Sequence, residues 1–208
     1  MESQNEVIYI VDDDFRVRES LTELFASYRR NVMSFASGME FLNFSRSDAN
    51  ACLILDLRLP EMNGLELQHV IEAETVLPII FITGDGDILS SVTAMKAGAV
   101  EFLTKPINER ALLSAVSDAL AKDRIARQNA AEREKILVRY NSLTPRERQV
   151  LPLLIRGLLN KQAAGVLGIA EYTIQVHRGR IMKKMQVDSF AELVRLATKL
   201  NVDTVKAS

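Results

Sequence analysis

The chain has 208 residues, of which 48% are hydrophobic and 25% charged, as is typical of a soluble globular protein. Its net charge of −1 hides an asymmetry: residues 1–120 contain 9 Lys/Arg and 19 Asp/Glu, whereas residues 142–208 contain 11 and 5. This contrast indicates two domains with different partners. The single cysteine, Cys52, excludes an intramolecular disulfide. The sequence shows no signal region and no long apolar run, so we expect a cytoplasmic protein with no membrane partner.

Short apolar runs recur through the first part of the chain, and segments with helical spacing separate them. Runs without polar alternation are typical of parallel strands that are covered on both faces. The sequence therefore predicts an α/β fold for residues 1–121, a doubly wound five-stranded parallel sheet of (βα)5 type. The five expected strands are Val7–Val11, Val32–Phe35, Ala51–Leu55, Pro78–Ile82 and Val100–Leu103.

Residues 122–141 have the composition of a helical linker. The segment is rich in Ala, Arg, Lys, Glu and Gln and contains no Gly or Pro. It continues a fifth helix that begins near Glu109, and Asp123 and Arg127 have the spacing of a helical ion pair. We expect a solvated, semi-rigid spacer rather than a flexible tether.

Residues 142–208 are expected to form an all-α domain with four helices, at about 144–156, 160–167, 171–185 and 189–199. Thr144-Pro145-Arg146-Glu147 is a capping box with Pro at the first helical position, which marks a helix start. We expect Asn160 to cap the second helix, and Gly168 to supply the positive φ of a tight turn. The order helix, turn, helix favours a helix-turn-helix.

Four of the expected strands end in residues that can bind a metal or a phosphate: Asp12 and Asp13, Asp56, Thr83, and Lys105. Each has an ordinary explanation when taken alone, as a cap, a turn or a loop residue. The carboxyl ends of parallel strands share one edge, however, so all should converge there. Clustered carboxylates suit Mg²⁺, and Asp56, which stands alone, is the best candidate nucleophile for an aspartyl phosphate.

These segments resemble the receiver domains of two-component response regulators over residues 5–125. The matching motifs are Val11–Asp14, Leu53–Pro60 with Gly64, Ile82–Gly84 and Phe102–Pro106. The resemblance implies that a sensor histidine kinase phosphorylates Asp56. It also implies that Asp13, Asp56 and the backbone carbonyl of Arg58 bind Mg²⁺ directly, while Asp12 acts mainly through water.

The same resemblance assigns the residues around the phosphoryl group. Thr83 and Lys105 would contact it, and Phe102 would be a switch aromatic that turns inward when Thr83 moves. The alternative that Phe102 is a plain core residue stays open. The family also implies a cis peptide bond before Pro106.

The expected third helix of the last domain is basic on one side and apolar on the other, as a recognition helix in the DNA major groove would be. The segments Leu143–Leu151, Gly157–Lys161 and Thr173–His177 resemble the LuxR/GerE-type helix-turn-helix, which places the chain in the FixJ/NarL class. The resemblance implies base contacts from Gln175, Val176 and Gly179. It implies phosphate contacts from Lys161, Thr173, His177, Arg178, Arg180 and Lys183.

We therefore expect a transcription regulator rather than an enzyme. Phosphorylation would produce a homodimer through the fourth helix, fifth strand and fifth helix, which binds double-stranded promoter DNA and can contact RNA polymerase. Two alternatives remain open. One is a Mg²⁺-dependent phosphohydrolase, although Arg58 stands where such enzymes usually carry a second Asp. The other is a DNA-binding protein that works without phosphorylation.

Overall fold

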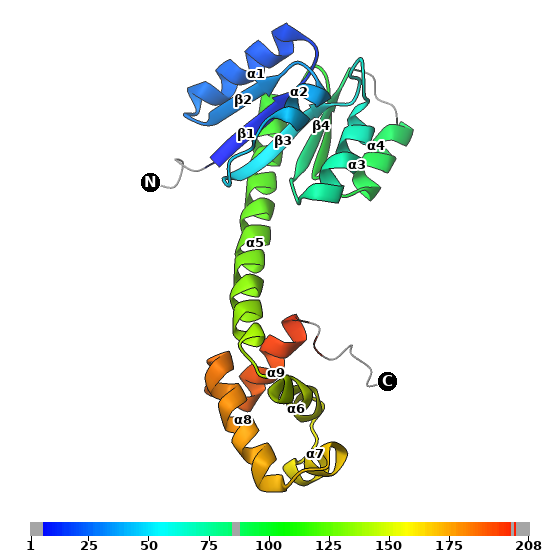
Figure 1. Cartoon of the computed structure of the whole chain (residues 1–208). Coiled ribbons are helices and arrows are strands. Elements are labelled where there is room, and N and C mark those ends of the chain that lie inside the picture. The colour runs from blue at the N-terminus through cyan, green and yellow to red at the C-terminus, as the bar shows by residue number, and fades with distance from the viewer. Residues whose placement is uncertain (1–5, 85–87, 201, 203–208) are drawn as a thin grey trace. The chain divides into compact units, whose positions relative to one another are not determined.

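A computed structural model describes residues 6–84, 88–200 and 202 of the chain (Figure 1). The chain divides into two compact units, residues 1–127 and residues 128–208. Each unit has its own buried apolar core.

The first unit is built on a parallel sheet of five strands in the order β2-β1-β3-β4-β5. The strands are β1 (Glu6–Val11), β2 (Asn31–Phe35), β3 (Asn50–Asp56), β4 (Ile79–Thr83) and β5 (Glu101–Thr104). Nearly every residue of β3 and β4 is buried. This burial explains their continuous apolar sequence, and the predicted α/β fold is confirmed.

Helices cover both faces of this sheet (Figure 1). They are α1 (Phe15–Ser27), α2 (Gly38–Asn43), α3 (Gly64–Glu74), α4 (Ile88–Lys96) and α5 (Glu109–Asn141). Side chains of α1 and α5 pack on one face, whereas α2, α3 and α4 pack on the other. Local signals set the starts of two of them: Asp14 caps α1, and Asn63 forms a capping box with Glu66 at α3.

Helix α5 is 33 residues long, and the boundary between the two units falls within it, after Arg127. The expectation of a solvated spacer is wrong at Asp123, which is a buried residue of the segment at 122–141. Asp123 is only 1% exposed; its Oδ2 accepts hydrogen bonds from the backbone N–H of Ala51 at 2.8 Å and from Nε of Arg127 at 2.7 Å. Arg124 pairs with Glu6 of β1 at 2.8 Å. This part of α5 is therefore fixed to the beginnings of β1 and β3.

The second unit contains α6 (Pro145–Ile155), α7 (Asn160–Leu167), α8 (Glu171–Met185) and α9 (Phe190–Lys199). The predicted capping box is confirmed: Glu147 accepts a hydrogen bond from the Thr144 N–H at 2.8 Å, and Thr144 Oγ1 accepts one from the Glu147 N–H at 3.3 Å. Gly168 has the predicted positive φ, 64°.

The predicted cap of α7 is wrong. Leu159 is the N-cap residue and Asn160 is the first residue of the helix. Gln162 supplies the capping interaction, because its side-chain oxygen accepts a hydrogen bond from the Leu159 N–H at 2.8 Å. Within the described ranges, no helix combines the length and the apolar character that a bilayer crossing requires.

Candidate functional site

Three carboxylates meet at the carboxyl edge of the sheet. Oxygens of Asp12, Asp13 and Asp56 all lie within 4.8 Å of one another. Asp12 is fully buried and Asp56 is 6% exposed, whereas Asp13 is exposed to solvent. An all-oxygen set with one open side fits Mg²⁺, which keeps several of its waters when a protein binds it.

Backbone geometry holds Asp56 in place. The Arg58 N–H donates to Oδ1 of Asp56 at 3.1 Å, which leaves Oδ2 for other partners. A Cβ atom at Gly64 would lie 2.5 Å from the carbonyl oxygen of Asp56. Only glycine therefore allows the start of α3 to pass this close to the site, which explains the Gly64 of the sequence motif.

Lys105 reaches two of the carboxylates from the loop after β5. Its Nζ donates to Oδ2 of Asp12 at 2.7 Å and to Oδ2 of Asp56 at 2.8 Å. The Lys105–Pro106 peptide bond is cis, and the Lys105 N–H donates to the carbonyl of Thr83 at 2.7 Å. The carboxylates and the Lys105 amine therefore converge at this edge, and Thr83 joins Lys105 through its backbone carbonyl.

The electrostatics of the site follow from this arrangement. Burial raises the pKa of Asp12 above its usual value, although hydrogen bonds from Lys105 and from the Asp14 N–H oppose the change. The pKa of Lys105 is also raised: burial disfavours its charge, but the hydrogen bonds to Asp12 and Asp56 outweigh that effect. The ammonium ion thus offsets part of the repulsion between the carboxylates.

Thr83 and Phe102 lie on the neighbouring strands β4 and β5. Thr83 is fully buried, and Phe102 is half-buried with its ring centroid 6.3 Å from that of Phe81. Phe102 thus packs against the apolar core in this structure. The inward movement that the family implies for Phe102 stays a prediction.

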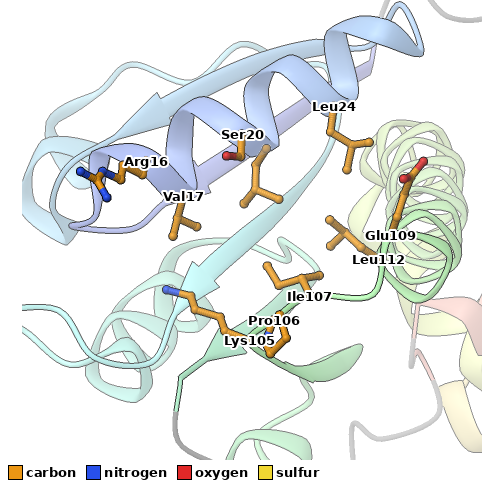
Figure 2. A pocket seen from close by; sticks show the side chains of 10 residues that line it. Arg16, Val17, Ser20, Leu24, Lys105, Pro106, Ile107, Glu109 and Leu112 are labelled. Carbon is orange, nitrogen blue, oxygen red and sulfur yellow. The ribbon is translucent and has the colours of Figure 1, made fainter.

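A pocket of about 460 Å³ lies between α1 and the loop that joins β5 to α5 (Figure 2). Lys105, which contacts Asp56 at its amine, forms part of its wall together with Pro106 and Ile107. Val17 and Leu24 of α1 contribute apolar side chains from the opposite side (Figure 2). The pocket therefore offers an apolar surface next to the acidic site.

The residues expected to contact DNA divide by exposure. Five are exposed to solvent: Lys161, Gln175, Gly179, Arg180 and Lys183. Thr173, Val176, His177 and Arg178 are half-buried. All except Lys161, which is the second residue of α7, lie on α8.

The exposed face of α8 also includes Tyr172, which is 74% exposed. Sequence reasoning did not single it out, although its helical spacing from Gln175 and Gly179 would have placed it on that face.

Two basic residues of α8 have partners within the unit. The guanidinium of Arg178 lies 4.5 Å from the ring centroid of Phe190 at the start of α9. Lys184 pairs with the buried Glu147 at 2.7 Å. This interaction and the capping bonds hold the pKa of Glu147 below its usual value, although burial acts in the opposite direction. Helix α8 is thereby joined to α6 on one side and to α9 on another.

Comparison with known proteins agrees with the division of the chain into two units. Residues 8–117 match the family described as response regulator receiver domain, and residues 141–197 match bacterial regulatory proteins of the luxR family. The chain is 47% identical to response regulator protein TodT of Pseudomonas putida over 96% of its own length and 88% of the relative's. It is 46% identical to response regulator protein TmoT of Ectopseudomonas mendocina, over 99% and 94%.

The solved structure of response regulator StyR is similar to most of this chain. It superimposes with a TM-score of 0.80 at 47% identity, covering 94% of this chain and 99% of StyR. Since both family matches and these full-length relatives agree, the chain belongs to the response regulators of two-component systems that carry a DNA-binding domain of the luxR family.

Proposed function

We propose that Asp56 is the phosphoacceptor of this response regulator. The observation that carries the proposal is the meeting of Asp12, Asp13 and Asp56 with the Lys105 ammonium at one sheet edge. One oxygen of Asp56 would attack the phosphorus of a phosphohistidine on the sensor kinase. The P–N bond would break, and the imidazole nitrogen of the kinase would leave and take up a proton.

The surrounding residues have distinct roles in this proposal. Asp13, Asp56 and the Arg58 carbonyl would hold Mg²⁺, with Asp12 acting through water, and the ion would neutralise charge on the phosphoryl oxygens. Lys105 would exchange its contact with Asp56 for one with a phosphoryl oxygen, and Thr83 would donate its hydroxyl. The kinase would approach over α1, where the apolar pocket of Figure 2 opens beside Lys105.

Phosphorylation of Asp56 would then change the surface of the first unit on the β5 side of the sheet. Movement of Thr83 and Phe102 would change the face formed by α4, β5 and α5, where Val92 and Met95 are each 45% exposed. A homodimer that buries these side chains would bring two α8 helices to adjacent half-sites of promoter DNA. Contact with RNA polymerase would follow if the protein activates transcription.

The acceptor is tested by intact mass spectrometry after incubation with acetyl phosphate and Mg²⁺. The wild-type protein should gain the mass of one phosphoryl group, and Asp56→Asn should not. Asp14→Asn is a matched control because Asp14 is a neighbouring exposed acid that caps α1, and Asn caps helices equally well. Equal uptake by Asp56→Asn and by the wild type would refute the assignment.

The same samples test the switch and its rivals. Phosphorylated wild-type protein should dimerise and bind duplex DNA more tightly than Asp56→Asn treated in parallel. Equal binding and equal dimer content would instead support a DNA-binding protein that works without phosphorylation. Sustained hydrolysis of a phosphomonoester would support the phosphohydrolase, although TodT and TmoT are both response regulator proteins.

A further inference from the structure

Gly179 lowers the stability of α8, and the fold of the second unit does not require a glycine at this position. It lies in the interior of α8, where glycine destabilises a helix relative to alanine. It is exposed, its φ lies outside the positive region, and a Cβ atom added to it would meet nothing within 4 Å. No packing or backbone constraint inside the unit therefore explains the absence of a side chain at this position.

Gly179 shares one face of α8 with Tyr172 and Gln175. The spacings of three and seven residues from Tyr172 place all three along one exposed stripe. Tyr172, in the first turn of α8, is 74% exposed, so most of its ring is open to solvent and available for contact. Along the helix, the stripe thus presents the ring of Tyr172, then the amide of Gln175, and then no side chain at Gly179.

Lys183, four residues after Gly179, continues this stripe toward the C-terminus of α8, and the other exposed cations lie beside it. Arg180 and Lys183 are exposed on α8 and Lys161 on α7, whereas Arg178 stacks on Phe190 and Lys184 pairs with Glu147. The uncharged part of the stripe, from Tyr172 to Gly179, is suited to contacts with base edges, and the cations around it are suited to phosphates.

We propose that Tyr172 is a specificity-determining residue whose ring makes apolar contact with a thymine methyl group in the major groove. Gly179 is the position at which the duplex approaches the backbone of α8 most closely, which a side chain there would prevent. Contacts with base edges of the DNA are thus concentrated in the N-terminal half of α8, as in other recognition helices. This inference rests on the DNA-binding role of the second unit.

The test uses the full chain, treated with acetyl phosphate and Mg²⁺, to select duplexes from a library with a randomised central segment. The wild type should enrich a consensus that includes a thymine which Tyr172→Ala no longer selects. By fluorescence anisotropy, Tyr172→Ala should bind the consensus roughly 5-fold to 100-fold more weakly, the usual range for one lost base contact, and a scrambled duplex almost equally. Tyr172→Phe should keep the preference, because the ring and not the hydroxyl makes the contact.

Gly179→Ala should separate stability from binding. Because nothing opposes the added methyl group, its melting midpoint should rise by a few degrees, while its affinity for the consensus duplex falls at least 5-fold. Gly165→Ala is the matched control: Gly165 is an exposed glycine of α7 whose Cβ would also meet nothing within 4 Å. Val166→Ala, which trims an exposed apolar side chain of α7, controls for Tyr172→Ala. Both controls should keep the wild-type affinity.

Several outcomes would overturn the proposal. They are an unchanged consensus and affinity for Tyr172→Ala, loss of the thymine preference in Tyr172→Phe, and wild-type or tighter binding by Gly179→Ala. If the wild-type protein selects no sequence at all, the DNA-binding role fails, and the inference fails with it. A consensus that the wild type and the variants share would instead refute this inference and leave the DNA-binding role intact.

Discussion

Lys105 donates a hydrogen bond to Oδ2 of Asp56 at 2.8 Å across 49 positions of sequence. Its Nζ is also 2.7 Å from Asp12, a buried carboxylate whose pKa is raised. A cation held between two acids stabilises the unphosphorylated site and stands where new negative charge would develop on a phosphoryl group. Both effects come from the loop that follows β5.

Replacing Lys105 with Met should slow phosphoryl uptake from acetyl phosphate by about 100-fold, since the loss of one preorganised donor at developing charge has effects of that size. Mg²⁺ should still bind, because all three carboxylates remain. Time-resolved intact mass spectrometry measures the rate. Lys122→Met, which removes an exposed lysine that contacts the Gly98 carbonyl, is the control. A wild-type rate for Lys105→Met would show that the ammonium is not used in the transfer.

The anchoring of α5 leads to a second prediction. Asp123→Ala would leave the buried N–H of Ala51 without its acceptor. It would also remove one of the two carboxylate partners of Arg127, which keeps its ion pair with Asp48. The free energy of unfolding of the first unit should fall by about 1–3 kcal/mol, because a buried backbone donor is left without a hydrogen bond. Urea denaturation combined with hydrogen exchange measures this loss. Asp118→Ala removes an exposed acid of the same helix and should change stability by less than about 0.5 kcal/mol.

The burial of Asp123 also shows where sequence reasoning stops. Its spacing from Arg127 predicted their ion pair correctly, but that spacing is the same on a solvated helix and on a docked one. The deciding partner, Ala51, is 72 residues away and contributes only a backbone N–H. The acidic site was easier to predict, because parallel topology brings strand ends together whatever their side chains. The exact cap of α7 and the stacking of Arg178 on Phe190 depend on local packing that residue types do not encode.

Glu147 should make the second unit less stable in acid. Its pKa is below the usual 4.5 in the folded protein, so its contribution is fully present above about pH 4.5 and is lost as the pH falls through the folded value. Glu147→Gln should lower the free energy of unfolding at pH 7 by about 1–3 kcal/mol, because Lys184 loses its charged partner. The difference from the wild type should shrink below pH 4.5. Hydrogen exchange of peptides from 144–185 measures both effects, with the exposed Glu171→Gln as control. A difference that is constant with pH would contradict the ion-pair explanation.

Lys183 and Arg178 should differ in how they contribute to DNA binding, although both are basic residues of α8. Lys183 is exposed, and a lysine that contacts a phosphate releases counterions from the duplex. Lys183→Ala should therefore weaken binding to a non-specific 30-base-pair duplex and reduce the slope of log affinity against log salt by about 0.9. Arg178 lies over the Phe190 ring, so Arg178→Ala should lower the melting temperature of the second unit and change the salt slope by much less. Fluorescence anisotropy across a salt series provides both slopes. If Arg178→Ala changes the slope as much as Lys183→Ala does, then Arg178 leaves Phe190 on binding and contacts a phosphate, as the family resemblance implies.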